Sequence, residues 1–423
     1  MRFVPNHAQC RQHAKRASDT GIVSTKPRQA GNLRFKLAND DVLDAAFDWL
    51  CHQRQDTSAN NDVWQLRRNW PAQKRALQGS LRKGQYQFDP LQHLSFGDGD
   101  ALDIWSARDA LVLKALQLVL QKALPVHPRC THVKGHGGLK RGVRELAEHL
   151  DEATANGKSG HVIRTDVKSY YASIDHNILL DALSRHIADK VVINLVSRFL
   201  NRSVEFGGTF THYTKGISRG CALSPLLGAF YLREMDEALS RQSVFYIRYM
   251  DDIVIVASNC HKLRRAIGKL NRILEALNLE KHPDKTFIGK ATRGFDFLGY
   301  HFRQVLAGRA VVSVAKQTIA NFNAKLAALQ EREVKPRCRK VTENSHSRRE
   351  ALRPTTGSKT SRLYEHGREA HESAHRVTGD PITTYINRWL GYIFGGLGDV
   401  ALDTTGVGAA FADGRRTQSA ASG

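Results

Sequence analysis

The chain has 423 residues, 41% of them hydrophobic, and is long enough for two or three folded domains with a sizeable core. Lysine and arginine number 63 against 41 acidic residues, a net charge of +22 at pH 7. This surplus predicts a polyanionic partner, with nucleic acid the first candidate. It is also compatible with a ribosome-like basic protein, and it says nothing of chemistry.

The cysteines are spread along the chain without a C-x2-C pair, so the sequence suggests neither a zinc finger nor a disulfide framework. They are Cys10, Cys51, Cys130, Cys221, Cys260 and Cys338. No run approaches the roughly 18 apolar residues of a membrane span. The residues before position 33 lack the apolar core of a signal peptide. We therefore expect a cytoplasmic protein with no membrane partner.

The N-terminal part predicts a leader followed by helices and a hairpin. Residues 1–38 are basic and weakly patterned, and we expect them to be mobile or to touch RNA. Apolar residues at helical spacing predict one helix from Asp40 and another that begins near Pro71 and ends around Gly84. LSFGDGDALDIW predicts two strands joined by a turn, and residues 108–124 predict a strongly apolar helix.

A glycine-rich basic stretch, THVKGHGGLKRGVREL, spans residues 131–146 and leads into a helix. Glycines beside lysines can cradle a phosphate, because backbone N–H groups approach the anion where no side chain intervenes. The stretch lacks the G-x4-G-K-[ST] spacing of a Walker loop. A phosphate-binding loop and an ordinary flexible loop both remain open.

Two stretches place carboxylates at the ends of β-branched strands. In GHVIRTDVKSYYASIDH a short strand delivers Asp166. In FYIRYMDDIVIVA, Asp251 and Asp252 interrupt a run that otherwise predicts buried strand. A solvated hairpin turn is the alternative for the Asp pair, although Gly or Asn normally accompanies Asp there.

Carboxylates on separate strands suggest a shared divalent-metal site. Mg²⁺ prefers oxygen ligands and is usually held by one or two carboxylates plus substrate phosphates. Two such ions about 3.5–4 Å apart stabilise the attacking and leaving oxygens of a phosphoryl displacement, as a nucleotide polymerase requires. We expect Asp166, Asp251 and Asp252 to lie on neighbouring strands and to bind two Mg²⁺ ions, with Mn²⁺ as a substitute.

The pattern between and after these stretches is mainly helical. Residues 177–200 look helical, and KGISRGCALSPLLGAFYLREMDEAL predicts a glycine-rich turn and an apolar helix that starts near Ser224. Residues 261–277 predict a further helix, 295–302 (FDFLGYHF) a strand pair, and 315–330 a helix with one apolar face.

The C-terminal part changes composition. Residues 331–380 are dominated by Arg, Lys, His, Ser and Thr and predict a basic linker that is disordered unless nucleic acid is bound. A last apolar patch, YINRWLGYIFGGL, precedes a flexible tail of small residues at 401–423.

The motifs, in this order, resemble those of reverse transcriptases over roughly residues 70–330. YMDD between apolar strands is that family's signature, and Asp166 followed by Tyr171 looks like its motif A. GISRGCALSPLLGAFYL looks like motif B, LNLEKHPDKT like motif D and FDFLGYHF like motif E. LSPLL and the upstream LRKGQYQFDP are similar to bacterial group II intron enzymes. YINRWLGYI resembles the end of a maturase-type thumb, and no cysteine-paired HNH endonuclease follows it.

The resemblance implies an α+β fold, a right-hand polymerase with fingers, palm and helical thumb. The antiparallel sheet of the palm would carry the YMDD hairpin. The implied domains are fingers at 39–160, palm at 161–302, and a thumb or maturase-like region at 303–400 that contains the basic linker.

The resemblance also implies roles for single residues. Asp166, Asp251 and Asp252 would be catalytic metal ligands, and Tyr171 would pack under the sugar and exclude a 2′-hydroxyl. Lys285 would protonate the departing pyrophosphate as a general acid, with a solvated lysine as the alternative. The other implied contacts are the nucleotide-binding Arg219, Gly220, Lys134, Lys140 and Arg141, and a primer grip of Leu298, Gly299 and Tyr300.

The chain departs from the family at two places. Ser218-Arg219-Gly220 stands where group II enzymes usually read Pro-Gln-Gly, and LSFGDGDALDIWSA lacks the usual basic residue for the triphosphate. The lysines and the arginine of the 131–146 stretch are the candidates to replace it. We expect Tyr170, next to Tyr171, to pack. Two features stay open from sequence: Arg248 binds primer phosphate or a carboxylate, and the primer-grip residues also fit plain strand packing.

The implied function is that of an RNA-directed DNA polymerase, a nucleotidyltransferase that copies an RNA template from dNTPs onto a DNA primer. A structured non-coding or intron RNA is the further partner that group II enzymes suggest. One alternative is an enzyme of antiviral defence that makes untemplated or protein-primed DNA. The other is a non-catalytic, maturase-like splicing cofactor that binds RNA.

Overall fold

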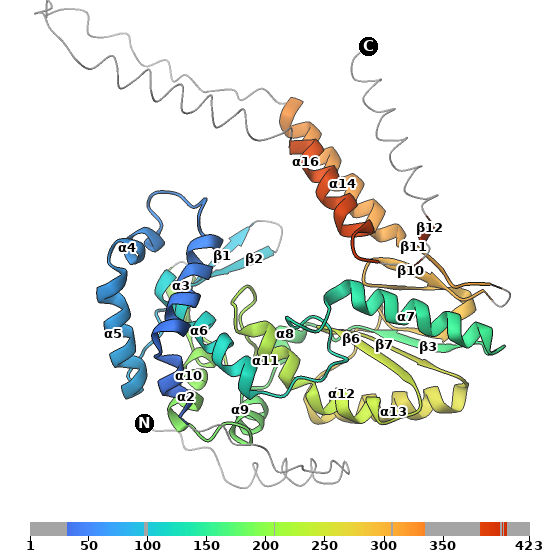
Figure 1. Cartoon of the computed structure of the whole chain (residues 1–423), viewed down its shortest axis with the longest axis horizontal. Helices are drawn as coiled ribbons and strands as arrows, with labels where there is room; N and C mark the ends of the chain where they lie inside the picture. The colour runs from blue at the N-terminus through green and yellow to red at the C-terminus, as the bar shows by residue number, and fades with distance from the viewer. Residues whose placement is uncertain are drawn as a thin grey trace, which may run out of the picture. The chain divides into compact units, whose positions relative to one another are not determined.

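The computed structural model describes residues 32–96, 100–206, 208–305, 308–334, 381–397, 400 and 402–403 (Figure 1). The predicted leader up to residue 31, the linker from 335 to 380 and nearly all of the predicted tail lie outside these residues. The chain divides into two compact units: Met1–Leu298 with Phe302–Ala310, and Gly299–His301 with Val311–Gly423.

The first unit begins with a group of helices. They are α2 (Leu33–Leu37), α3 (Asp40–Gln53), α4 (Asp62–Arg68), α5 (Trp70–Lys83) and α6 (Ala107–Ala123). Pro71 lies in the first turn of α5, and Gly84 ends that helix in the left-handed region, at φ 68°, as the sequence predicts. Ser106 caps α6 by accepting a hydrogen bond from the backbone N–H of Asp109. The apolar side of α6 packs against α3 in the core.

A small sheet accompanies these helices, with strand order β2-β1-β4-β5. The predicted strand–turn–strand is present as β1 (Leu91–Phe96) and β2 (Asp100–Ile104), which pair antiparallel. A second hairpin, β4 (Ser203–Phe206) with β5 (Thr209–His212), joins β1 through parallel pairing. This second hairpin was not predicted from the sequence.

The first unit continues with further helices and a central sheet. The helices are α7 (Gly138–Ala155), α8 (Tyr170–Ser173), α9 (His176–Ser184), α10 (Lys190–Leu200), α11 (Ser224–Tyr231), α12 (Arg233–Ser240) and α13 (Cys260–Ala276). The stretch 177–200 is mostly helical, as expected, but it forms two helices. The helix stops at Ser184 and restarts at Lys190, because the Asp189 side chain caps a new helix by accepting from the Val191 N–H at 3.1 Å.

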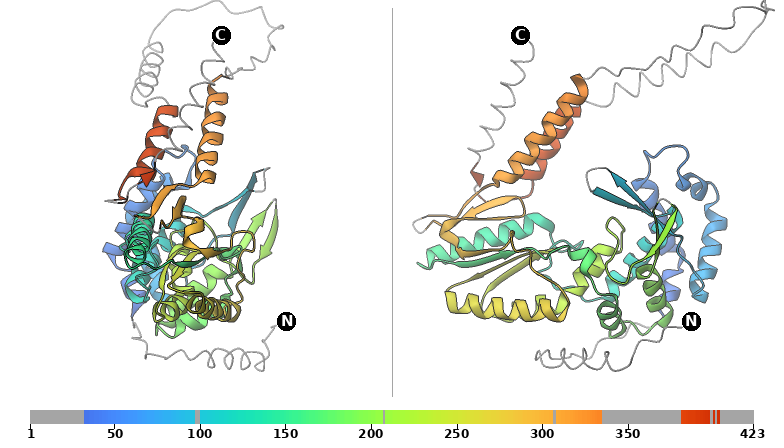
Figure 2. Two further views of the ribbon diagram at one scale, coloured as in Figure 1. Left: turned by 90° about the vertical axis from the view of Figure 1, so that its right-hand side faces the viewer. Right: turned by 180° about the vertical axis from the view of Figure 1, so that it is seen from behind.

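The central sheet has strand order β6-β7-β3-β8 and is antiparallel throughout. Its strands are β3 (His161–Thr165), β6 (Phe245–Tyr249), β7 (Asp252–Ala257) and β8 (Phe287–Lys290). Helix α7 covers one face, and α12 and α13 cover the other (Figures 1 and 2). Coverage on both faces explains why β7 reads as a continuous apolar run rather than an alternating one.

The chain then passes from the first unit to the second. The 3-10 turn η1 (Ala291–Arg293) is followed by β9 (Phe295–Phe297) and β10 (Tyr300–Arg303). In the second unit β11 (Val311–Val314) pairs in parallel with β12 (Leu402–Asp403). Helices α14 (Lys316–Val334) and α16 (Pro381–Phe394) pack together through Phe322, whose ring lies 4.2 Å from that of Trp389. None of the helices in the described ranges is long and apolar enough to cross a membrane.

Candidate active site

The central sheet brings the three predicted carboxylates together. Asp166 directly follows β3, Asp251 lies in the turn between β6 and β7, and Asp252 is the first residue of β7. Thr165 pairs with Ile253 across the antiparallel β3–β7 ladder, so the residues just beyond, Asp166 and Asp252, lie at the same edge. Asp166 is only 7% exposed. The solvated-turn interpretation of the Asp pair does not describe this partly buried cluster.

The cluster carries more negative charge than its surroundings compensate. Burial and the neighbouring carboxylate of Asp166 raise the pKa of Asp251 to about 6. Burial also raises the pKa of Asp252, and Arg164 partly offsets that rise. A cation placed among these side chains would stabilise their ionised forms.

Two cationic side chains already contact the cluster. Lys285 Nζ lies 2.7 Å from Asp166 Oδ2, although its side chain is 53% exposed. Arg164 Nη2 lies 3.0 Å from Asp252 Oδ1, and its Nη1 donates to the Lys285 carbonyl at 3.0 Å. Arg164 lies on β3 and Lys285 just before β8, so neighbouring strands of the same sheet supply both cations.

The donor chemistry of the cluster fits a hard divalent cation, because carboxylate oxygens are the ligands that Mg²⁺ prefers. Within the described ranges, however, no three His, Cys, Asp or Glu side chains form a ready-made metal site. Asp166 and Asp252 face Lys285 and Arg164 instead. A metal ion bound by these residues would therefore compete with the two cationic side chains for the carboxylate oxygens.

Arg248, left undecided by the sequence, binds a carboxylate. It is fully buried, and its Nε and Nη2 lie 2.8 Å and 2.5 Å from the two carboxylate oxygens of Asp236 on α12. Asp236 is equally buried and also accepts from the Tyr246 hydroxyl at 2.5 Å. Because Arg248 has no exposed surface, a contact with primer phosphate does not fit this structure.

The aromatic pair that follows Asp166 packs on α11. A methyl group at Gly228 would lie 3.3 Å from the rings of both Tyr170 and Tyr171, so a larger residue there would require both rings to shift by a few tenths of an ångström. Tyr170 is buried and donates its hydroxyl to the Gly228 carbonyl at 2.5 Å, which fits the expected packing role. Burial, with a smaller contribution from the charge of Asp251, raises the pKa of the Tyr171 hydroxyl to about 12.

The loop before α11 is tied to β2. The buried Ser218 hydroxyl donates to Asp103 Oδ2 at 2.5 Å and accepts from Trp105 Nε1 at 3.3 Å. Arg219 and Gly220 follow it and are exposed. Gly220 has φ 85° with open space where a Cβ would lie, so a left-handed turn presents Arg219 to solvent.

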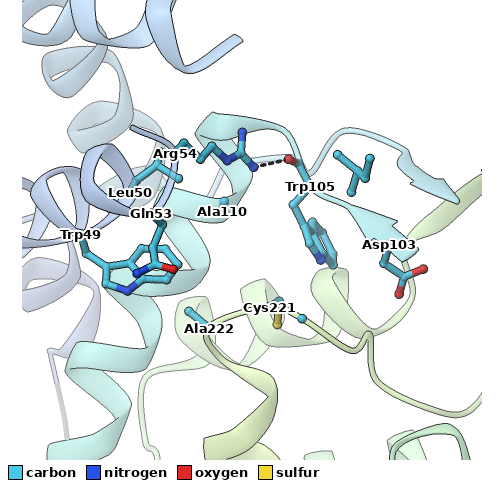
Figure 3. A pocket seen from close by; sticks show the side chains of 11 residues that line it. Trp49, Leu50, Gln53, Arg54, Asp103, Trp105, Ala110, Cys221 and Ala222 are labelled. Atoms are coloured by element: carbon cyan, nitrogen blue, oxygen red, sulfur yellow. Dashed lines mark hydrogen bonds between the residues drawn. The ribbon is translucent and has the colours of Figure 1, made fainter. Parts of the chain in front are cut away.

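A cavity of about 300 Å³ adjoins this loop (Figure 3). Gly220, Cys221, Trp105 and the α3 residues Trp49 and Gln53 are among the residues that line it. Arg54, another lining residue, donates to the Trp105 carbonyl at 2.7 Å. The segment that follows Arg219 therefore lines the cavity.

The glycine-rich loop lies beside the β6–β7 hairpin, because the Thr131 N–H donates to the Arg248 carbonyl at 2.9 Å. Its three candidate phosphate ligands differ in their surroundings. Arg141 pairs with Glu145 at 2.5 Å, and burial lowers the pKa of Lys140. Lys134 is exposed. Of the three, Lys134 is the one whose charge faces solvent most openly.

The predicted primer grip is a tight turn between β9 and β10. Leu298 and Gly299 both have positive φ values, 51° and 85°. Leu298 is 9% exposed, and Tyr300 is fully buried and donates its hydroxyl to the Ile393 carbonyl at 2.7 Å. This burial agrees with the strand-packing alternative for the two side chains.

Sequence reasoning missed several residues that shape the site. Arg164 and Asp103 stand on strands among ordinary neighbours, and nothing in the sequence pairs them with Asp252 or Ser218. His132 lies in the glycine-rich stretch, and its sequence neighbours do not indicate a role for it. The available signal was indirect: a charged Arg248 within a buried strand demands a carboxylate partner somewhere in the fold.

Comparisons with known proteins agree with this geometry. Residues 107–302 match the family model for reverse transcriptase (RNA-dependent DNA polymerase). Protein YkfC of Escherichia coli (strain K12) is 25% identical over 301 residues, 60% of this chain and 78% of YkfC. The COX1/OXI3 intron 1 protein of Saccharomyces cerevisiae is 22% identical over 288 residues, 53% of this chain and 34% of that protein. Group II intron-encoded protein LtrA of Lactococcus lactis subsp. cremoris is 25% identical over 169 residues, 37% of this chain and 26% of LtrA.

The matched segment contains all three carboxylates of the cluster and the hairpin that carries Asp251 and Asp252. The chain spans most of YkfC but about a third or less of the two intron-encoded relatives. Residues 107–302 are therefore a reverse transcriptase domain, and the chain is similar to group II intron-encoded proteins.

Proposed function

We propose that this protein is an RNA-directed DNA polymerase that extends a DNA primer on an RNA template from dNTPs. The observation that supports this most strongly is the cluster of Asp166, Asp251 and Asp252 at one edge of a sheet inside the matched domain. In this proposal the central sheet is the palm, the N-terminal helices with β1 and β2 are the fingers, and α14 with α16 belong to the thumb.

Asp166 and Asp251, with Asp252 beside them, would hold the divalent ions. Bound there, Mg²⁺ supplies charge stabilisation to the attacking and leaving oxygens of nucleotidyl transfer. The raised pKa of Asp251 supports this assignment. A carboxylate whose ionised form is destabilised by burial and by a like charge gains most from a nearby cation.

Other side chains would bind and orient the substrates. Tyr171, set between Gly228 and Asp251, would lie under the sugar and reject a 2′-hydroxyl. Lys285 would deliver a proton to the pyrophosphate from its position on Asp166. Arg219 and Lys134, both exposed, would contact phosphates.

Template and primer would be held mainly through their phosphates. The net charge of +22 supports this mode, which predicts binding that weakens steeply as salt rises. LtrA is a group II intron-encoded protein, and we extend the proposal to a structured intron-like RNA as a partner of this chain.

Primer extension tests the proposal. Purified protein is given an RNA template with an annealed DNA primer, dNTPs and Mg²⁺, beside an Asp251→Ala control and a lane without template. We expect template-dependent product that the variant does not make. Product without template would point to the defence-type enzyme, and RNA binding without synthesis in any lane would point to the splicing cofactor.

A further inference from the structure

The residue before Asp251 has an unusual backbone. Met250 has φ 53°, in the left-handed region that side-chain-bearing residues seldom occupy, and it is the first residue of the two-residue turn between β6 and β7. Glycine is the usual residue at such a turn position. A conformation of this kind persists only where its surroundings hold it in place.

Both backbone polar groups of Met250 are held by side chains. Its N–H donates to Nδ1 of His132 at 3.0 Å, and its carbonyl accepts from Nη1 of Arg248 at 2.6 Å. Arg248 is in turn fixed by the buried Asp236. The peptide groups on either side of Met250 are therefore fixed, and the second of them carries Asp251.

His132 connects this turn to α11. Because a backbone N–H can only donate, Nδ1 of His132 accepts, which leaves the ring proton on Nε2. Nε2 then donates to the Pro225 carbonyl at 3.1 Å. Burial, reinforced by Arg248, lowers the pKa of His132 to about 4, so the ring is neutral at pH 7 and keeps Nδ1 free to accept.

We propose that His132 is a positioning residue for polymerisation: its Nδ1 holds the Met250 N–H and so fixes the turn that presents Asp251. The inference rests on the proposed function. Loss of this hydrogen bond lets the left-handed turn relax and displaces Asp251, and misplacement of a reacting group by about 1 Å can cost about a hundredfold in rate.

Two substitutions test the roles of the two ring nitrogens of His132 separately. His132→Asn keeps an acceptor near the Nδ1 position and loses the donor to Pro225. His132→Gln keeps a donor near the Nε2 position and loses the acceptor for Met250. His149→Gln is the matched control. The His149 ring stacks on that of Phe245, the first residue of β6, with ring centroids 4.6 Å apart.

The measurements are kcat and KM in primer extension, Mn²⁺ binding followed by electron paramagnetic resonance without nucleotide, and the thermal unfolding midpoint. We expect His132→Gln to lower kcat by about ten- to a hundredfold with little change in dNTP KM. We also expect it to weaken Mn²⁺ binding. His132→Asn should retain most of both properties, and His149→Gln should match the wild type.

The opposite order, in which His132→Asn is impaired and His132→Gln is not, would overturn the inference and assign His132 to bracing α11 alone. Equal loss in both variants together with equally lowered unfolding midpoints would also overturn it. If the wild type makes no DNA, the proposed function fails, while Mn²⁺ binding by the same variants still decides whether His132 positions Asp251.

Discussion

The ammonium group of Lys285 lies 2.7 Å from Oδ2 of Asp166, on the carboxylate that the proposed chemistry needs for a metal ion. The same group is the candidate general acid. One side chain therefore has opposite effects on two steps: it competes with the metal for Asp166, and it would assist departure of the pyrophosphate.

Lys285→Met tests this pairing. We expect the variant to bind Mn²⁺ more tightly, because a competing cation is gone, and to have a kcat about ten- to a hundredfold lower, because the general acid is gone. Calorimetric titration with Mn²⁺ and single-turnover extension measure the two effects. Lys290→Met, at the exposed far end of β8, is the control. Changes of kcat and affinity in the same direction would refute the dual role.

Tyr171 should set the choice of sugar. Tyr171→Ala opens space beside Gly228, so we expect discrimination between dNTPs and rNTPs to fall by roughly a hundredfold or less, the range that one hydroxyl supports in a shape-selective pocket. The measurement is kcat/KM for dCTP and rCTP on the same template. Tyr170→Phe removes only the bond to the Gly228 carbonyl and should leave the ratio unchanged. Unaltered selectivity in Tyr171→Ala would assign that ring to packing.

Ser218 should hold the nucleotide-facing loop. Ser218→Ala removes the hydroxyl that donates to the Asp103 carboxylate and accepts from the Trp105 indole N–H. We expect this loss to lower the free energy of unfolding by about 1–3 kcal/mol. Because Arg219 is the next residue, we expect dNTP KM to rise several-fold more than kcat falls. Ser184→Ala, whose hydroxyl donates only to the Asp181 carbonyl, is the control for both measurements. An unchanged KM would separate this loop from nucleotide binding.

Asp236 should be essential for stability. Asp236→Asn leaves the fully buried Arg248 without its counter-charge, and we expect the free energy of unfolding to fall by about 3–5 kcal/mol. Urea denaturation measures this loss. Glu237→Gln, which affects only the partly exposed pair with Arg241, should change stability by about 0.5 kcal/mol or less. Equal stability of the two variants would contradict the structural importance of the buried pair.

The sequence predicted elements whose cause is local. Pro71 and Gly84 bracket α5, and the β-branched run around Asp251 and Asp252 produced the expected strands on both sides of the turn. Spacing and capping act within a few residues, so a single sequence displays them. The carboxylate cluster followed in the same way, because strand ends that share one sheet edge bring their side chains together.

The long-range contacts could not be predicted. Arg164 and Asp252 are 88 residues apart, Asp103 and Ser218 are 115 apart, and His132 and Met250 are 118 apart. Each pairing depends on how strands are ordered and how loops cross, which periodicity does not encode. The break at residues 185–189 was not predicted, because this stretch is compatible with a helix and sequence alone does not distinguish a capping Asp189 from an Asp within a helix.

The proposed function depends above all on Asp251 as a metal-binding carboxylate of a polymerase. The most direct measurement is the single-turnover rate of primer extension by Asp251→Asn, with Asp284→Asn as the control because Asp284 is exposed before β8. We predict a loss of roughly a thousandfold for the first variant, since several kcal/mol of charge stabilisation disappear, and a near wild-type rate for the second. Extension by Asp251→Asn at the wild-type rate would contradict the account.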